Sequence, residues 1–403
     1  MKINVGAIEL GPDEKKFLME VINSNRISEG KFVNRFEREW ANFIGTKHCI
    51  LFNSGTSSIM AGLKALELKD GGIKPNTKII TSPLTYVATS NAIVTTGFEP
   101  VYVDVDSTNF NITPDNIKEH LELADDTEKY SLILPVHLMG YPCNMDEINK
   151  IAKKFALLTF EDSAQAHGTK CGNKICGSCS EVSDFSFYVA HNIQAGEMGA
   201  LTTDNDEIAR IAKKIKANGR ACDCPICTRP QGTCPKLNNG ENKLDYDPRF
   251  SHELVGYNFK TTEFQAAIAS AQFKKINFII KKRQENVKYL NENLNIFSDI
   301  LQLPIYSKEV SYLAYPMVIN KPDIISRKKL RAELERMGVE TRPLFGCIPT
   351  QQPAFSYLKK KYDGKLPNAD YLGKNAFYIG CHQYLKQEDL DYIIQSIKQI
   401  VKK

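Results

Sequence analysis

CILFNSGTSSIMAGLKAL, residues 49–66, decides the fold class of this chain. The apolar run Cys49–Phe52 predicts a buried strand, Asn53–Gly55 a turn, and the stretch that begins near Thr56 a helix. A helix that starts directly after a buried strand is typical of α/β architecture. Its unpaired N–H groups and partial positive charge can bind a phosphate. The alternative is a simple helix N-cap that binds no ligand.

The same alternation continues through the first two thirds of the chain. Helix-like stretches such as Ser57–Leu68 and Met145–Phe155 lie between short apolar runs. The expected strands are Cys49–Phe52, Lys78–Thr81, Pro100–Asp104, Ser131–His137, Leu157–Phe160 and Asp184–Tyr188. This pattern predicts an α/β fold with a mostly parallel sheet that helices cover on both faces.

The last third predicts a second, smaller unit. We expect a large domain of residues 1–270 and a smaller α+β domain of residues 271–403, connected by the helical pattern of Thr262–Leu294. The smaller domain should contain strand Tyr312–Ile319, helix Arg327–Met337, strand Val339–Pro343 and a final helix. One face of that final helix is apolar, through Leu390, Ile393, Ile394, Ile397 and Val401.

Composition and charge argue against nucleic acid and membranes as partners. The chain has 403 residues, is 42% hydrophobic and carries a net charge of +5. Its Lys and Arg residues are not gathered on one arm or face, as a nucleic-acid-binding protein would need. No run reaches the roughly 18 apolar residues of a membrane span, and the N-terminus lacks the apolar core of a signal peptide. We expect a soluble cytoplasmic protein.

The eleven cysteines are unevenly distributed. In a reducing compartment they are thiols or metal ligands rather than disulfides. RACDCPICTRPQGTCPKLNNG, residues 220–240, has the spacing C-x-C-x2-C-x6-C through Cys222, Cys224, Cys227 and Cys234. This spacing is compatible with an iron–sulfur cluster, a four-thiolate zinc site, or free, redox-labile thiols. Cys171, Cys176 and Cys179 form a second group.

Two further stretches bear on a ligand. LLTFEDSAQAHG, residues 157–168, predicts a buried strand that ends at Glu161 and Asp162. Acids at the carboxyl end of a parallel strand lie where α/β sheets bind ligands. SFYVAHNIQAGEMGA, residues 186–200, predicts a short strand that runs into a Gly-rich turn and carries His191.

Five segments then occur in a recognisable order: NSGTSS (53–58), TSPLTYVATSNAI (81–93), EDSAQAHG (161–168), SFYVAHN with GEMGALTT (186–203), and GYNFKTTEFQAAIASAQF (256–273). Together they resemble the fold-type-I pyridoxal-phosphate enzymes of the DegT/StrS class, which act on nucleotide-linked keto sugars. The resemblance covers nearly the whole chain. It implies the aspartate-aminotransferase fold, pyridoxal or pyridoxamine phosphate as cofactor, and a homodimer with shared active sites.

The resemblance also implies a role for each matching residue. Asp162 would pair with the protonated ring nitrogen and keep the ring cationic, so that the ring can act as an electron sink. Gln165 would contact the ring hydroxyl, and Tyr86 would stack on the ring. The remaining cofactor-binding residues would hold the phosphate, with Asn258 reaching it from the other subunit: Gly55, Thr56, Ser57, Ser186 and Asn258.

His191 stands where aminotransferases of this class have the lysine that forms a Schiff base. A histidine cannot form a stable imine, but it can move protons. It therefore suits the pyridoxamine form, held without a covalent link. This replacement resembles the 3-dehydratases of the class. One kind acts on GDP-4-keto-6-deoxymannose and regenerates its own cofactor amine. The other acts on CDP-4-keto-6-deoxyglucose, carries a [2Fe-2S] cluster and takes electrons from a reductase.

The implied function is removal of the C3 hydroxyl from a nucleotide-linked 4-keto-6-deoxyhexose, with His191 as the base. If the cysteines hold a cluster, the resemblance to the cluster-bearing dehydratase implies iron–sulfur assistance and a flavin or iron–sulfur reductase partner. Two features depart from the cluster-bearing dehydratase: Ala164 stands at the position of its first ligand, and the interval from Cys224 to Cys234 is longer. Alternatives are a self-transaminating dehydratase, a sugar aminotransferase and a non-enzymatic cofactor-binding regulator.

Two further polar residues each allow two interpretations. VETRPLFGCIPTQQPAF, residues 339–355, resembles the part of these dehydratases that closes over the sugar. Within it, Arg342 is either a substrate contact or a surface arginine at a strand end. His167 either approaches the cofactor ring or packs below it.

Overall fold

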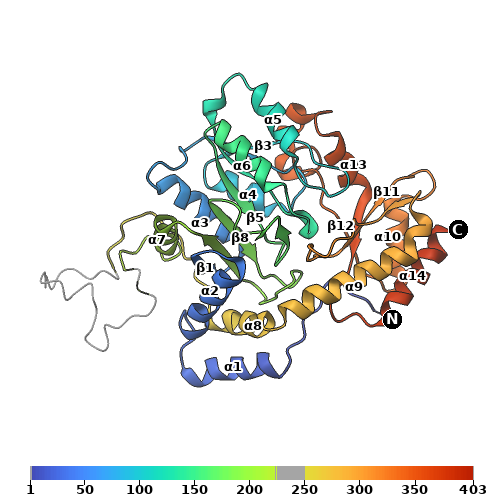
Figure 1. Cartoon of the computed structure of the whole chain (residues 1–403), viewed down its shortest axis with the longest axis horizontal. Coiled ribbons are helices and arrows are strands. Elements are labelled where there is room, and N and C mark those ends of the chain that lie inside the picture. Colours follow the sequence, from blue (N-terminus) through green and yellow to red (C-terminus); the bar gives the residue numbers. More distant parts are fainter. Residues whose placement is uncertain (1, 223, 225–249, 403) are drawn as a thin grey trace, which may run out of the picture.

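The computed structural model describes residues 2–222, 224 and 250–402. A seven-stranded sheet with the order β1-β9-β8-β5-β4-β2-β3 lies at its centre (Figure 1). The strands are β1 (His48–Phe52), β2 (Lys78–Thr81), β3 (Glu99–Tyr102), β4 (Tyr130–Leu134), β5 (Leu158–Asp162), β8 (Val182–Ser186) and β9 (Gly199–Thr203). Only β9 runs antiparallel to its neighbours, β1 and β8. The predicted α/β fold with a mostly parallel sheet is confirmed.

The alternation of side chains along each strand divides the core between the two faces of the sheet. In β1, Ile50 and Phe52 join one buried cluster, whereas Cys49 and Leu51 join another. The first face is covered by α3 (Gly55–Leu68), α4 (Ala88–Thr95) and α7 (Asp206–Ile215). The second face is covered by α2 (Lys31–Ile44), α5 (Pro114–Glu122), α6 (Met145–Lys154) and α8 (Glu263–Phe273), and α1 (Pro12–Ser24) packs on α8.

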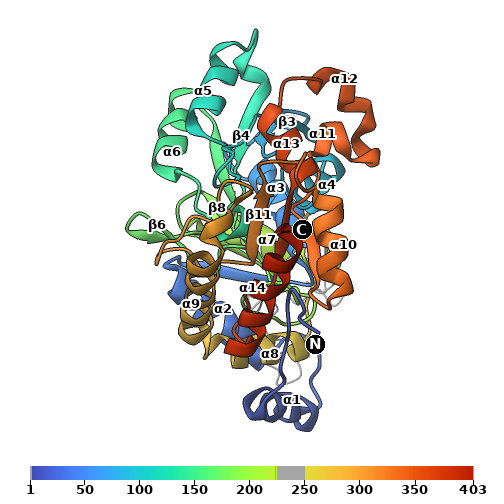
Figure 2. The ribbon, with the colours of Figure 1, turned by 90° about the vertical axis from the view of Figure 1, so that its right-hand side faces the viewer.

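A four-stranded antiparallel sheet, ordered β10-β11-β13-β12, forms the C-terminal part. Helix α9 (Ile276–Leu294) runs from α8 to this part and contacts α14 (Gln387–Val401) (Figure 2). The other elements are β10 (Leu301–Gln302), β11 (Tyr315–Ile319), α10 (Arg327–Arg336), β12 (Thr341–Pro343), α11 (Ile348–Gln351), α12 (Lys359–Tyr362), α13 (Pro367–Asn375) and β13 (Ala376–Ile379). One buried cluster joins the two sheets, so a domain boundary at residue 270 stays a prediction.

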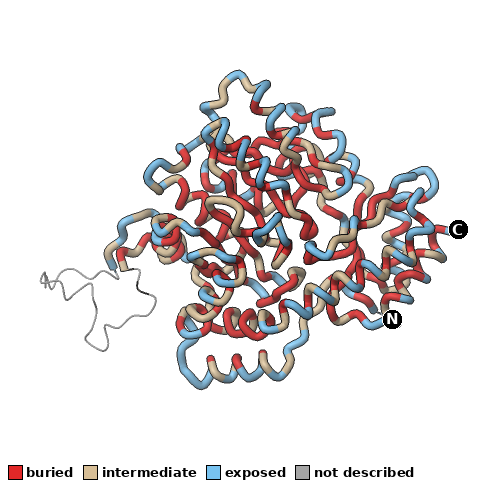
Figure 3. Tube along the Cα trace, viewed as in Figure 1, coloured by how far each residue is buried: buried red, intermediate tan, exposed pale blue. Residues whose placement is uncertain are grey.

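Most predicted elements occur within a few residues of their expected bounds. Strand β9 was not predicted, because GALTT is short and follows a Gly-rich stretch, yet all five residues are buried. The hairpin of β6 (Lys170–Cys171) and β7 (Lys174–Ile175) was also not predicted. Buried positions gather around the central sheet, whereas α1 is largely exposed (Figure 3). No helix in the described part of the chain is long and apolar enough to cross a bilayer.

Trp40 on α2 joins the helical layer to the sheet. Its indole is fully buried and contacts the rings of Phe43, Phe185 and Phe187 at centroid distances of 5.5, 5.1 and 5.1 Å. The edge-to-face contacts with Phe185 and Phe187 add favourable aromatic geometry to the burial of a large apolar surface. These contacts tie α2 to β8 and to the residue that follows it.

We expect Trp40→Ala to lower the free energy of unfolding by about 3–5 kcal/mol, because it leaves a large cavity among these rings. Urea unfolding followed by circular dichroism measures the loss. Leu123→Ala is the matched control, since Leu123 is 76% exposed and should change stability by less than about 0.5 kcal/mol. Similar losses in both variants would contradict this account of the core.

Candidate active site

Several of the predicted site residues lie at one edge of the central sheet. Since β9 is antiparallel to both β1 and β8, these two strands run in the same direction, as do β2, β4 and β5. The carboxyl ends of all five strands therefore lie at the same edge. This edge carries Asn53–Gly55 after β1, Asp162 at the end of β5 and Ser186 at the end of β8. Edges of this kind are where α/β sheets bind ligands.

The turn after β1 begins α3 as predicted, although the helix starts at Gly55 rather than near Thr56. Ser54 is the N-cap: its Oγ accepts the Ser57 N–H at 3.1 Å and lies 2.9 Å from the Ser57 Oγ. A Cβ at Gly55 would lie 2.8 Å from the Ser186 Cβ, so only glycine allows β8 to come this close. The structure thus brings Gly55 and Ser186 together. Ser54 was missed, although a serine before a helix start is a common cap signal.

Asp162 is a buried carboxylate with few partners. Its side chain is 5% exposed, and it accepts hydrogen bonds from the Thr89 Oγ1 at 2.8 Å and the Ala164 N–H at 3.2 Å. Burial raises the pKa of Asp162, and these two hydrogen bonds oppose that shift. A cation at this position would stabilise the ionised form.

Gln165 and Tyr86 lie at the same edge of the sheet. The Gln165 Oε1 accepts the Met139 N–H at 2.8 Å, which leaves the amide nitrogen as the donor of this side chain. Tyr86 is 62% exposed, and its ring lies 6.1 Å from that of Phe345, edge to face. Phe345, which follows β12, is a neighbour that sequence reasoning did not identify. The predicted roles of Gln165 and Tyr86 stay predictions.

His191 lies in the turn between β8 and β9. Its N–H donates to the Tyr188 carbonyl at 2.9 Å, and its Nδ1 is buried with no partner among the described residues. Its ring stacks on that of His167 at 5.8 Å with an angle of 27° between the ring planes. His167 is fully buried, and its ring lies 5.2 Å from the ring of Trp40. His167 is therefore a core residue on which the His191 ring stacks.

Burial, followed by the nearby positive charge of Arg283, lowers the pKa of His191 to about 3. Arg283 on α9 is 1% exposed and donates to the carbonyls of Tyr312 and Leu313 at 3.2 and 2.7 Å. The imidazole of His191 is consequently neutral at pH 7, which is the form that accepts a proton. Arg283 lies far from His191 in sequence, so no motif points to it.

A second buried acid lies beside Asp162. Asp184 on β8 is the register partner of Asp162 on β5, is 1% exposed, and has no hydrogen-bond partner for either carboxyl oxygen among the described residues. Burial and the negative charge of Asp162 raise the pKa of Asp184 well above its usual value. Both effects favour the uncharged form of Asp184 beside Asp162. Sequence reasoning identified Asp184 only as part of a strand.

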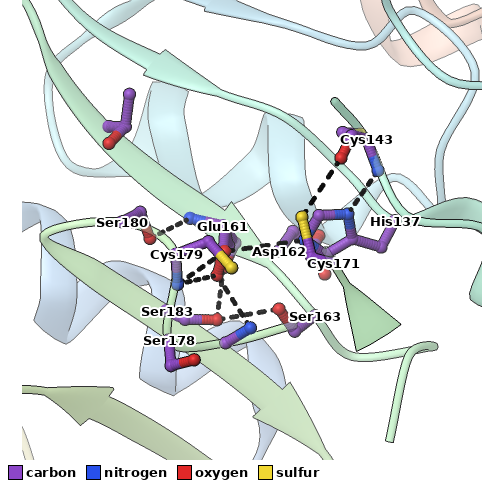
Figure 4. A network of polar contacts seen from close by, with 12 residues as sticks. His137, Cys143, Glu161, Asp162, Ser163, Cys171, Ser178, Cys179, Ser180 and Ser183 are labelled. Atoms are coloured by element: carbon purple, nitrogen blue, oxygen red, sulfur yellow. Dashed lines mark hydrogen bonds and ion pairs between the residues drawn. The ribbon is translucent and has the colours of Figure 1, made fainter. Parts of the chain in front are cut away.

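Glu161, the neighbour of Asp162, belongs to a polar network that includes the segment after hairpin β6–β7 (Figure 4). Its carboxylate accepts the backbone N–H groups of Gly177 at 2.7 Å and Cys179 at 3.1 Å. The His137 Nε2 lies 3.8 Å from the Glu161 Oε2, and both side chains are fully buried. The strand that carries Asp162 is therefore connected to the hairpin β6–β7.

Arg342 and Asn258 lie at the margins of this region. The Arg342 guanidinium pairs with Glu340 at 3.0 Å, and its side chain is 37% exposed. Asn258 is exposed and pairs through its backbone with Ala217. The backbone carbonyl of the next residue, Phe259, accepts the Asn53 N–H at 2.8 Å. This hydrogen bond places the segment against the turn after β1. Substrate contact by Arg342 and a role for Asn258 across a dimer stay predictions.

The predicted metal ligands are only partly within the described residues. Cys222 and Cys224 line one cavity of about 270 Å³ together with Arg26, Lys216 and Lys260. Cys227 and Cys234 lie outside the described residues. Within the described part of the chain, no group of three His, Cys, Asp or Glu side chains is arranged to hold a metal ion.

Comparison with known families identifies the chain. Residues 9–398 match the DegT/DnrJ/EryC1/StrS aminotransferase family, so the chain belongs to that family. It is 33% identical to a dTDP-4-dehydro-2,6-dideoxy-D-glucose 3-dehydratase from Saccharopolyspora spinosa, over 99% of this chain and 86% of the relative. It is 27% identical to a GDP-perosamine synthase from Caulobacter vibrioides, over 99% and 98% of the two chains.

A solved structure has the same fold. The Escherichia coli GDP-4-keto-6-deoxy-D-mannose-3-dehydratase with bound hydrated PLP superposes with a TM-score of 0.86 at 26% identity. The match covers 98% of this chain and 99% of that one. The aspartate-aminotransferase fold expected from the sequence is confirmed.

We expect His191 to remain neutral down to roughly pH 5, well below the ordinary histidine pKa of about 6.5. Imidazole nitrogen shifts followed by NMR during a pH titration measure this, with His191→Gln to assign the signal. Arg283→Met should raise the pKa of His191 because it removes a nearby positive charge, whereas Arg283→Lys should keep it low. A wild-type His191 that titrates near pH 6.5 would contradict the buried, neutral imidazole.

Proposed function

We propose that this member of the DegT/DnrJ/EryC1/StrS aminotransferase family is a pyridoxamine-phosphate-dependent dehydratase that removes the C3 hydroxyl of a nucleotide-linked 4-keto-6-deoxyhexose. His191 carries the proposal. It occupies the turn between β8 and β9 where aminotransferases of this class have a lysine, and its imidazole is held neutral. A neutral imidazole accepts protons but forms no stable imine. The 3-dehydratases among the relatives support the same reaction class.

The residues at the sheet edge fit the cofactor. A phosphate matches the N-terminus of α3, where Gly55 and Thr56 can offer N–H groups, Thr56 and Ser57 can offer hydroxyl groups, and Ser186 lies beside Gly55. Asp162 needs a positive charge beside it, and the protonated nitrogen of a pyridine ring supplies one. Gln165 can donate its amide N–H to a ring hydroxyl. The N-terminus of α3, the Asp162 carboxylate and the Gln165 amide would thus bind the phosphate, the ring nitrogen and the ring hydroxyl of one molecule.

When bound, the cofactor would supply an amine that condenses with the C4 keto group and a ring that accepts electrons. The chain's residues perform the remaining tasks. The His191 imidazole accepts the proton released from the amine-bearing carbon. Asp162 holds the proton on the ring nitrogen through its negative charge. Tyr86 covers the ring, which limits the access of water to the reacting atoms.

The substrate and the second subunit complete the site. Arg342 would contact the substrate's anionic portion, which requires it to exchange its ion pair with Glu340 for that contact. Asn258 would reach the cofactor phosphate of the partner subunit, so the active enzyme is a homodimer.

We expect His191→Ala to abolish formation of the 3-deoxy sugar, because the variant lacks the base. Pyridoxamine phosphate should still bind, because other residues hold its phosphate and ring. Product formation from CDP- and GDP-linked 4-keto-6-deoxyhexoses is followed by mass spectrometry, and cofactor binding by absorbance. His191→Gln is the matched control of similar polarity and should be equally inactive.

Borohydride treatment of the protein with pyridoxal phosphate tests the aminotransferase alternative. The proposal predicts that no cofactor becomes covalently fixed. Full product formation by His191→Ala, or a cofactor fixed by borohydride to a lysine, would overturn the dehydratase assignment. Cofactor binding with no turnover of either sugar in the wild type would support a non-enzymatic regulator.

We further propose that the cysteine motif holds a [2Fe-2S] cluster through Cys222, Cys224, Cys227 and Cys234. The close thiol spacing supports this, as does the position of Cys222 and Cys224 in one cavity beside basic side chains, which match a cluster of negative thiolates. The cluster would supply single electrons from a flavin or iron–sulfur reductase. Ala164 cannot serve as a ligand, since its side chain is a methyl group.

Cys222→Ser with Cys224→Ser should remove the iron from anaerobically purified protein, because two of four thiolates are lost. Iron, zinc and sulfide assays with the visible spectrum measure this. Cys49→Ser is the control, since Cys49 is a buried residue of β1. Zinc in place of iron would assign a structural zinc site, and an unchanged metal content in the double variant would refute these ligands.

A further inference from the structure

The turn that carries His191 is fastened to the C-terminal part of the chain by the next residue, Asn192. The Asn192 side chain is fully buried, and its Nδ2 donates to the Ser311 carbonyl at 2.9 Å. The same Nδ2 lies 3.5 Å from the Tyr312 carbonyl oxygen. Ser311 and Tyr312 directly precede β11, and Ser311 is 119 residues away from Asn192 in the sequence. One amide thus joins the turn between β8 and β9 to a distant segment.

The segment that receives this amide is itself held on several sides. The Ser311 N–H donates to the Thr169 Oγ1 at 3.0 Å, and the hydroxyl oxygens of these two residues are 2.9 Å apart. The Arg283 Nη1 donates to the carbonyls of Tyr312 and Leu313 at 3.2 and 2.7 Å. Tyr312 has a φ of 45°, a left-handed conformation that persists only where the surroundings hold it. This segment is therefore a fixed point to which the turn can be tied.

The residue after Asn192 makes a second connection. The Ile193 N–H donates to the His167 Nδ1 at 3.3 Å, and the His167 ring stacks on that of His191. The His191 Nδ1, in contrast, has no hydrogen-bond partner among the described residues. The position of the His191 imidazole therefore depends on the stacking on His167 and on the backbone of the turn, which Asn192 and Ile193 fasten.

We propose that Asn192 is a positioning residue for the base of the reaction, because its amide fixes the turn that carries His191. The expected effect on turnover rests on the proposed function, whereas the effect on the surroundings of the His191 ring does not. Without the amide, the fully buried Ser311 would lose the donor to its carbonyl, and the turn would lose its connection to the segment before β11. A purely structural asparagine would contribute to stability alone.

The state of the His191 ring distinguishes the two roles. Burial is the largest cause that lowers the pKa of His191, and the positive charge of Arg283 is the second. A loosened turn gives the ring more water and no longer fixes its distance from Arg283, so the pKa of His191 should rise. His167, the titratable ring against His191, adds no charge at pH 7, because burial lowers its pKa well below the usual value.

Asn192→Leu removes the amide and nearly retains the side-chain volume. We expect the pKa of His191 to rise by about 1–2 units in this full-length variant, measured by NMR titration of the imidazole nitrogens. Pyridoxamine phosphate should bind as in the wild type. The kcat of C3 deoxygenation should fall roughly 10- to 100-fold with KM nearly unchanged, since a displaced base slows the chemical step rather than substrate binding.

Asn291→Leu is the matched control. Asn291 on α9 also donates its amide to a backbone carbonyl, that of Pro304 at 2.8 Å, but this contact lies outside the His191 turn. The control should lose stability in urea, while the pKa of His191 and the kcat stay at their wild-type values. Asn192→Ser, whose hydroxyl is too short to replace the amide, provides the same test if Asn192→Leu does not fold.

An unchanged pKa of His191 in the folded Asn192 variants, or an equal rise in Asn291→Leu, would overturn the positioning role. A raised KM with an unchanged kcat would assign Asn192 to substrate binding and would also overturn it. If the wild type deoxygenates neither CDP- nor GDP-linked sugar, the proposed function fails for these substrates, while the pKa comparison still decides whether Asn192 positions His191.

Discussion

A buried carboxylate at the end of β5 is the constraint on which the site depends. Asp162 receives only two hydrogen bonds from Thr89 and Ala164, and burial disfavours its charged form. The positive charge of His137 also favours the ionised form, yet burial still raises the pKa of Asp162. To ionise readily, Asp162 therefore requires a further positive charge, which a ligand can supply. A pyridine ring with a protonated nitrogen meets this requirement, which is why the other groups at this edge are best understood around such a ring.

The same low-polarity environment acts on His191 in the opposite chemical sense. Burial raises the pKa of an acid and lowers that of a base, so the site holds both Asp162 and His191 away from their charged forms. Arg283 adds to the effect on His191 without touching the sheet edge. A neutral base and a carboxylate that needs a cation are the two states that the proposed reaction requires. Burial is the largest cause of both shifts.

Sequence reasoning anticipated the groups that lie within single motifs. The strand–turn–helix at Gly55, the acid at Asp162 and the histidine at His191 were each predicted, because local periodicity and turn residues report on local structure. The stacking of His167 on His191, the raised pKa of Asp184 and the effect of Arg283 on His191 were not predicted. These depend on which strands pair and on how α9 packs, and no short segment encodes them. Strand β9 was missed for the same reason: its burial comes from pairing with β1 and β8.

The sequence by itself determined the class of fold, most strands of the central sheet, and the replacement of the expected lysine by His191. It also revealed that two groups of cysteines exist. Only the tertiary structure decided that Gly55 meets Ser186 and that Arg283 acts on His191. The physical reason is that side-chain type and spacing set local conformation, whereas burial, and the electrostatics that follow from it, arise only when distant segments exclude water together.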